Sequence, residues 1–205
     1  AFLTTYRTRV LGKTTVPLDA LNAFTEETNA ANVQADASVW KLEKELPVDI
    51  DFHLSGAMTN AKVAGSATAT TPYTLTVGDM FTLMPYENSL LVMQINGEQL
   101  KAILERGYRN YWYYKYSPNY GGYSHYTTCM LDVNAGTVIT YTDPGASMLP
   151  NGNNVVAMTF NNGTPVVFDA AHTYTVSTVN YLAAGSCNFN DGGVTLWPLD
   201  QLLHD

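Results

Sequence analysis

The sequence predicts an α+β fold in which a mixed β-sheet is flanked by helices. Ser89–Ile95 alternates and is rich in Leu, Val and Ile, as expected of a buried strand, and an expected helix stands on each side of it. The chain has 205 residues, 46% of them hydrophobic, which suffices for a sizeable core. We expect one domain over residues 1–205, and two at most, because no internal repeat or linker is visible.

The charge of the chain limits the classes of partner that we expect it to bind. A net charge of −8 and a pI of about 4.8 argue against a nucleic acid polymer, whose phosphates would be repelled. The apolar runs are only strand-sized, so no membrane span is expected. Charged residues make up 14% of the chain, and Thr, Asn and Tyr are frequent. This composition is typical of secreted folds, and we expect a secreted, periplasmic or cell-surface protein.

The first third predicts strands separated by loops. Phe2–Leu18 alternates, which predicts one or two strands, and Asp19–Phe24 is expected to form a loop. Val48–Leu54 predicts a further strand. Ala61–Tyr73 is small and rich in Thr, which favours an exposed loop or a ragged hairpin.

One long helix is expected within this third. Thr28 or Asn29 can cap its N-terminus, the helix should run from about Ala30 to Glu45, and Pro47 should end it. Alanines along it would allow close packing on a sheet. Its core-facing stripe is expected to be Val33, Ala37, Trp40 and Leu42.

Two further helices flank the Ser89–Ile95 strand. Thr76 and Asp79 have the spacing of a capping box, so a short helix should start at Val77, and Pro85 should stop it. Asn96 can cap the following helix. The apolar stripe of that helix is expected to be Leu100, Ile103 and Leu104.

Tyr108–Tyr126 is crowded with aromatic residues. Pro118-Asn119 and Gly121-Gly122 favour a loop over a helix in this segment. Two interpretations stay open. The rings either pack over a surface and interlock, or part of the cluster forms a stacking rim for a base, a sugar or a partner domain.

The C-terminal third predicts two hairpins, a strand and a loop. Thr127–Thr142 is expected to form two strands joined by an Asn-Ala-Gly turn. Val155–Phe160 and Pro165–Phe168 are expected to form a second hairpin. Tyr174–Thr178 predicts a strand, and a long loop should follow it over Asn180–Gly193.

Catalytic patterns are not found in the chain. The four histidines are scattered without a carboxylate at ligand spacing, and no Gly-x-Ser-x-Gly elbow, phosphate loop or zinc pattern occurs. We therefore predict no catalytic residue, no metal ligand and no cofactor in this chain. Cys129 and Cys187 are too far apart for a CxxC motif, which leaves two buried thiols or one disulfide. A binding loop is suggested by residues 86–88, an aromatic and an amide held between a helix and a strand.

Three blocks of sequence resemble the C-terminal domain of the 5'-nucleotidase family. Gly78–Leu100 is similar to the family's short helix, Pro-Phe-Gly-Asn turn, strand and Thr-Gly-x-x-Leu helix, and it reads Pro-Tyr-Glu-Asn at residues 85–88. Glu27–Ala37 is similar to the family's Glu-Thr-Asn-Leu-Gly-Asn-Leu-x-Ala-Asp-Ala. Tyr174–Gly185 is similar to the family's late strand and Gly-rich loop. The blocks keep their order and spacing, and the resemblance spans about Val10 to Trp197.

The resemblance implies the substrate-binding domain of a metallophosphoesterase that hydrolyses phosphate esters of nucleotides. The family includes UDP-sugar hydrolases and 2',3'-cyclic phosphodiesterases. Its divalent metal pair lies in a separate N-terminal domain with Asp-x-His and Gly-Asn-His motifs, and neither motif occurs here. The implied partners are a nucleotide or nucleoside and this N-terminal metallophosphatase domain. The chain alone should be inactive.

Site residues follow from the same resemblance. It places Tyr86 and Tyr181 where two aromatics sandwich the base, although both rings could instead cap the core. Asn88 would bond a base edge or orient the turn, and Asp191 would hold the ribose hydroxyls. The cleft would also be lined by Ser55, Gly56 and Asn60.

Two departures from the family pattern affect the residues that would bind the substrate phosphate. Thr59 and Phe24 stand where the family has arginines, and neither side chain can neutralise a phosphate. A second hypothesis is therefore a diverged, non-catalytic binding module for a sugar, nucleoside or protein partner, and a third is a purely structural domain. The resemblance also places Cys129 and Cys187 near the same cleft, which favours a disulfide between them.

Overall fold

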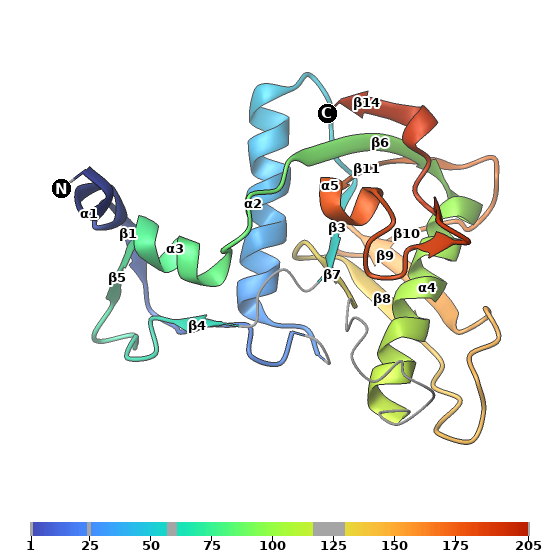
Figure 1. The fold of residues 1–205 in the computed structure, drawn as a ribbon, viewed down its shortest axis with the longest axis horizontal. Coiled ribbons are helices and arrows are strands. Elements are labelled where there is room, and N and C mark those ends of the chain that lie inside the picture. Colours follow the sequence, from blue (N-terminus) through green and yellow to red (C-terminus); the bar gives the residue numbers. More distant parts are fainter. Residues whose placement is uncertain (1, 24–25, 57–60, 117–129, 205) are drawn as a thin grey trace.

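The computed structural model describes residues 2–23, 26–56, 61–116 and 130–204. Its centre is a five-stranded mixed sheet with the order β14-β6-β11-β3-β7 (Figure 1). Strand β11 runs parallel to β3, and the other neighbours are antiparallel. The predicted α+β fold with a mixed sheet flanked by helices is confirmed. The strands are β3 (Phe52–Gly56), β6 (Leu90–Asn96), β7 (Leu131–Val133), β11 (Thr173–Val179) and β14 (Leu202–His204).

Helix α2 (Asn29–Glu45) lies on one face of this sheet, and Thr28 caps it as predicted. Of the expected core-facing stripe only Leu42 is buried; Val33 and Trp40 are 46% and 61% exposed, and Ala37 is exposed too. A sheet face lets a helix approach closely only where the side chains are small. The thin side of α2 therefore faces the sheet, and its buried residues are Ala30, Ala31, Gln34, Ala35, Ser38 and Leu42.

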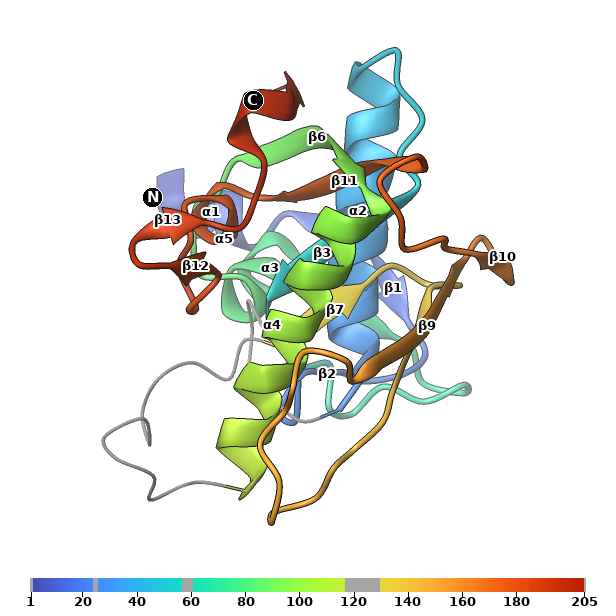
Figure 2. The same cartoon turned by 90° about the vertical axis from the view of Figure 1, so that its right-hand side faces the viewer.

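Helix α4 (Gly97–Tyr116) lies on the opposite face (Figures 1 and 2). Its N-terminus is closed by two reciprocal bonds, in which the Gln99 N–H donates to Asn96 Oδ1 and the Asn96 N–H donates to Gln99 Oε1. Gly97 is required where the helix begins, since a Cβ there would stand 2.1 Å from the Val167 carbonyl oxygen. Helix α4 therefore begins directly after Asn96, as predicted.

The C-terminal half of α4 corrects one prediction. Tyr108–Tyr116 was expected to be a loop and is helical, because the helix breakers come only after Tyr116. The Tyr108 and Tyr141 rings stack at 5.0 Å, and Asp143 accepts hydrogen bonds from the Tyr108 and Tyr116 hydroxyls. In this part the rings interlock and fasten the helix. The remainder of Tyr108–Tyr126 lies outside the described residues.

A smaller sheet, with the order β10-β9-β8, packs on the α4 side. It consists of β8 (Val138–Tyr141), β9 (Val155–Phe160) and β10 (Thr164–Pro165), and its β9–β10 hairpin was predicted. The hairpin expected within Thr127–Thr142 was wrong, since β7 pairs with β3 and β8 pairs with β9. The turn between β7 and β8 is bonded to β3 and α2: Asn134 Oδ1 accepts from the His53 N–H, and the Ala135 N–H donates to Asp36 Oδ1. The chain therefore leaves the central sheet at this turn.

The N-terminal segments form a small group to the left of α2 in Figure 1. Phe2–Arg7 was expected to be a strand and is helix α1. The Tyr6 ring lies 6.4 Å from that of Phe81, so α1 packs on α3 instead of pairing with a strand. Strand β1 (Val10–Thr14) then pairs with β5 (Tyr73–Thr76).

Helix α3 (Val77–Leu83) begins and ends as predicted. Thr76 Oγ1 accepts from the Asp79 N–H, and Asp79 Oδ2 accepts from the Thr76 N–H, which completes the capping box. The helix ends two residues before Pro85. The segments expected to be loops contain the short elements β2 (Leu18–Asp19), β4 (Lys62–Val63), α5 (Asn180–Ala183) and β12 (Asn190–Asp191). The C-terminal tail adds β13 (Val194–Thr195) and the 3₁₀ turn η1 (Leu199–Gln201).

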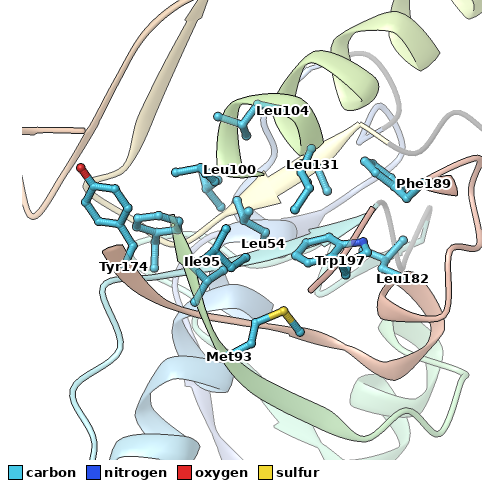
Figure 3. Close-up of a cluster of buried hydrophobic side chains, with 14 of the residues drawn as sticks. Leu54, Met93, Ile95, Leu100, Leu104, Leu131, Tyr174, Leu182, Phe189 and Trp197 are labelled. Carbon is cyan, nitrogen blue, oxygen red and sulfur yellow. The ribbon is translucent and has the colours of Figure 1, made fainter. Parts of the chain in front are cut away.

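The main core lies between the central sheet, α4 and the smaller sheet (Figure 3). Leu100, Ile103 and Leu104 of α4 are fully buried there, as their helical spacing predicted. The strands contribute alternate residues, because successive side chains point to opposite faces of a sheet. Figure 3 labels from this core Leu54, Met93, Ile95, Leu100, Leu104, Leu131, Tyr174, Leu182, Phe189 and Trp197.

Candidate functional site

The topology gathers several predicted site residues at one edge of the central sheet. Strands β11 and β3 are parallel, so their C-terminal ends lie at the same edge, and the antiparallel strand β6 begins there. Asn88 precedes β6, Tyr181 follows β11, and Ser55 and Gly56 end β3. Ligands of open α/β sheets bind at the C-terminal ends of parallel strands. We call this edge the site edge.

The two predicted stacking residues lie on segments that are tied together. Val179 and Leu90 are partners where β11 and β6 pair. Immediately beyond them, the Asn180 N–H donates to the Ser89 carbonyl at 2.9 Å, and the Ser89 N–H donates to Asn180 Oδ1 at 3.1 Å. Both segments are therefore held at the site edge by the sheet and by this reciprocal pair.

Both rings project into solvent. Tyr86 is 68% exposed, and Tyr181, on α5, is 49% exposed. Neither ring therefore serves as a buried cap of the core. Asn88 is half-buried between Tyr86 and the start of β6. The arrangement offers two aromatic faces and one amide to a ligand.

Ser55 and Gly56 are buried at the end of β3. The Ser55 hydroxyl donates to Gln34 Oε1 of α2 at 3.3 Å, so its polar group is engaged inside the protein. Asn60 lies outside the described residues, as do Thr59 and Phe24. Of the three residues expected to line the cleft, the structure thus describes two.

Asp191 lies on β12 and forms an ion pair with Arg106 of α4. Arg106 also donates to the carbonyls of Asn188 and Asn190, at 2.5 and 2.6 Å. These bonds fasten the β12–β13 hairpin to α4 and engage Oδ1 of Asp191, the carboxylate that was expected to hold ribose, while its side chain stays 72% exposed. No local sequence pattern indicates this ion pair, since 85 positions separate the two residues.

Cys187 follows α5 and Gly185 in this hairpin region. It is disulfide-bonded, which removes the hypothesis of two free thiols. Cys129 lies outside the described residues, so the pairing of the two cysteines stays a prediction. The Asn110 amide donates to the Cys187 carbonyl at 2.8 Å, which adds a second attachment of this loop to α4.

The α2 side of the sheet holds a buried, hydrogen-bonded pair of polar side chains. His53 Nδ1 and Ser177 Oγ are hydrogen-bonded at 2.8 Å on adjacent strands. Burial lowers the pKa of His53 to about 3, so the imidazole is neutral at physiological pH. No charge is therefore available from this histidine for a ligand.

Asp132 of β7 is a buried carboxyl that the sequence reasoning missed. Burial, together with the nearby Glu27 carboxylate, raises the pKa of Asp132 to about 7. The residue lines a cavity of about 130 Å³ that Glu27 and Thr137 also border. An acid in the middle of the apolar strand Leu131–Val133 was the available signal.

The described residues contain no group of three or more His, Cys, Asp or Glu side chains placed to hold a metal ion. Within the same part of the chain, no helix has the length and apolar character to cross a membrane.

The comparisons with known proteins identify the family of the chain. The family described as "5'-nucleotidase, C-terminal domain" matches residues 10–191, so the chain belongs to that family. The chain is also similar to the trifunctional nucleotide phosphoesterase protein YfkN of Bacillus subtilis, with 28% identity over 185 residues. That match covers 88% of this chain and 11% of YfkN.

Solved structures share the fold. The 5'-nucleotidase precursor of Thermus thermophilus matches 95% of this chain, with a TM-score of 0.66 and 21% sequence identity. NAD nucleotidase of Haemophilus influenzae matches 91% of this chain, with a TM-score of 0.59 and 17% sequence identity. This chain covers 36% and 31% of those two chains. It therefore spans about a third of the neighbours with this fold, and a far smaller part of YfkN.

Proposed function

We propose that this chain is the nucleotide- or nucleoside-binding domain of a 5'-nucleotidase-like metallophosphoesterase. The observation that carries the proposal is the pair of exposed tyrosines, Tyr86 and Tyr181, on segments tied by the reciprocal Ser89–Asn180 hydrogen bonds. Two aromatic faces on neighbouring, fixed segments suit a flat base. Stacking of a base on one such ring contributes about 1–3 kcal/mol.

The proposal includes a partner domain. The chain offers no metal cluster among its described residues and spans about a third of the solved relatives. We infer that a metallophosphatase domain with a divalent metal pair lies N-terminal to it in the whole protein and performs the hydrolysis. Disulfide-bonded Cys187 favours an exported, oxidising location for that protein.

Titration calorimetry with adenosine and AMP tests the binding role. We expect Tyr86→Ala and Tyr181→Ala each to weaken adenosine binding by roughly tenfold, which corresponds to about 1.4 kcal/mol. Tyr114→Ala is the matched control, because Tyr114 is 49% exposed, as Tyr181 is, and lies on α4. Unchanged affinity in both site variants, or no binding to the unmodified chain, would contradict the proposal.

A second candidate is a diverged binding module without catalysis. Thr59 and Phe24, at the positions of the family's arginines, favour it, because neither side chain carries a positive charge. The same titration separates the two candidates. A nucleotidase domain should hold AMP more tightly than adenosine, whereas a module that reads only the base should bind the two ligands with equal affinity.

A further inference from the structure

A second surface with binding character lies along the C-terminal half of α4. Two hollows, of about 630 and 370 Å³, are both lined by Arg106, Arg109, Tyr113 and Asp191. They are the two halves of one depression, which we call the α4 groove. Its outer walls are the 185–192 loop and the 149–152 loop, and Figure 2 shows α4 between these two segments.

The two arginines of the groove differ in what they bind. Arg106 is only 12% exposed and is occupied by Asp191 and two carbonyls. Arg109 is exposed, and among the described residues no carboxylate forms an ion pair with it. Glu105 also lines the smaller hollow, where its carboxylate accepts the backbone N–H groups of Asn154 and Val155. Arg109 is therefore the cation of the groove that has no ion-pair partner among the described residues.

Tyr113 orients that cation. The Arg109 guanidinium lies 5.7 Å from the centre of the Tyr113 ring, and Nη2 donates to the Tyr113 hydroxyl at 3.5 Å. A guanidinium carries five N–H donors, so most of its donors stay available to a ligand. A guanidinium over a ring is pre-organised for the paired oxygens of a phosphate or carboxylate.

We propose that the α4 groove binds a small organic molecule bearing a phosphate or carboxylate, with Arg109 as the anion-binding residue. The larger hollow has the volume of a typical small-molecule pocket, about 300–1,000 Å³, and a bare ion would fill only a fraction of it. Tyr113 supplies an aromatic wall for the organic part. The proposal requires neither Tyr86 nor Tyr181, although the groove shares Asp191 with the expected nucleoside site.

Protein-observed NMR tests the groove with phenyl phosphate, benzoate and inorganic phosphate as probes. Phenyl phosphate or benzoate at millimolar concentration should shift the Arg109 Nε–Hε signal and the backbone amides of residues 185–192. Arg109→Gln should weaken this binding by about tenfold, and Arg109→Lys by less, because a lysine keeps the charge without the fork. Comparison of phenyl phosphate with benzoate shows which anion the groove prefers.

The controls separate the groove from other causes. Arg9→Gln removes the same charge from an exposed arginine outside the groove and should leave the probes' affinities unchanged. Tyr181→Ala should do the same, which keeps failure of this proposal distinct from failure of the nucleoside site. The proposal is overturned if no probe shifts these signals, if Arg109→Gln binds the organic probes as tightly as the unmodified chain, or if inorganic phosphate binds as tightly as phenyl phosphate and benzoate.

Discussion

The two faces of the central sheet are built from alternate residues of the same strands, yet they differ in chemistry. On β3, Phe52 and Leu54 enter the main core beneath α4, whereas His53 and Ser55 face the α2 side with polar partners. The α4 face is held mainly by apolar burial, which has no directional requirement, and the buried Glu105 carboxylate adds hydrogen bonds to the Asn154 and Val155 N–H groups. The α2 face depends on hydrogen bonds that work only in one arrangement.

Both faces contain buried polar atoms without a hydrogen-bond partner among the described residues: Gln34 Nε2 and His53 Nε2 on the α2 face, and Thr178 Oγ1 and Trp197 Nε1 on the α4 face. Each such atom costs about 1–3 kcal/mol. The faces differ in apolar burial, because the apolar cluster of the α2 face is small and centres on Leu42, Ile50 and Val92. Stability therefore comes mainly from the α4 face.

Matched leucine truncations give the largest test of this comparison. Leu100 of α4 is 0% exposed in the main core, and Leu42 of α2 is 7% exposed in the small cluster. Leu→Ala changes cost about 2–5 kcal/mol, depending on the cavity that remains. We expect Leu100→Ala toward the upper end and Leu42→Ala toward the lower end, measured by urea unfolding. An equal or larger loss for Leu42→Ala would reverse the assignment of the two faces.

The same comparison explains what the sequence could predict of the fold. Both helix N-termini that flank β6 were found, because a cap is a local pattern of residues such as Thr76 with Asp79. The buried side of α2 was not found, since periodicity marks Val33 and Trp40 as apolar but cannot say which helix side meets the sheet. The pairing of β7 was missed because partners far apart in sequence leave no local pattern.

The candidate site likewise contains residues that could be predicted from the sequence and contacts that only the folded chain reveals. Tyr86 and Tyr181 came from the family resemblance, and their neighbouring placement rests on the register of β6 and β11, across about ninety positions of the chain. Arg106 and Asp191 meet only in the folded chain, so the ion pair that occupies Asp191 could not be foreseen. Local chemistry was predictable, whereas contacts between distant segments required the fold.

The pH dependence of stability should come from the α2 face, first through His53. Its folded pKa of about 3 lies below the ordinary value of 6.5. Below pH 6.5 the unfolded chain binds a proton at His53 that the folded chain does not bind until about pH 3. Acid therefore favours unfolding across this window, by on the order of 1.4 kcal/mol per pH unit.

His53→Asn should remove this contribution. Urea unfolding at pH 7 and pH 5 should show a smaller loss of stability on acidification in the variant than in the unmodified chain. The comparison within each protein cancels the cost of the substitution itself. An identical loss in both proteins would mean that His53 titrates normally in the folded chain.

Asp132 should change the stability of the protein with pH in the direction opposite to His53. Its folded pKa of about 7 lies above the ordinary value of 3.8, so the folded chain retains a proton that the unfolded chain has lost. Its contribution to stability is present at low pH and declines as the pH rises from about 4 to 7. We expect Asp132→Asn to gain stability relative to the unmodified chain between pH 5 and pH 8, measured by urea unfolding. A variant that is equally destabilised at both pH values would contradict the raised pKa.

The smallest effect distinguishes a structural from a ligand-binding role for Ser55. Its hydroxyl is buried and donates to Gln34 Oε1, so Ser55→Ala should cost about 1 kcal/mol in urea unfolding by leaving that acceptor unpaired. Because the hydroxyl is engaged inside the α2 face, adenosine affinity in calorimetry should stay unchanged. Affinity reduced about tenfold at unchanged stability would instead mean that Ser55 turns toward the ligand. The polar face of the sheet would then extend into the binding site, and the two faces would differ in function as well as in stability.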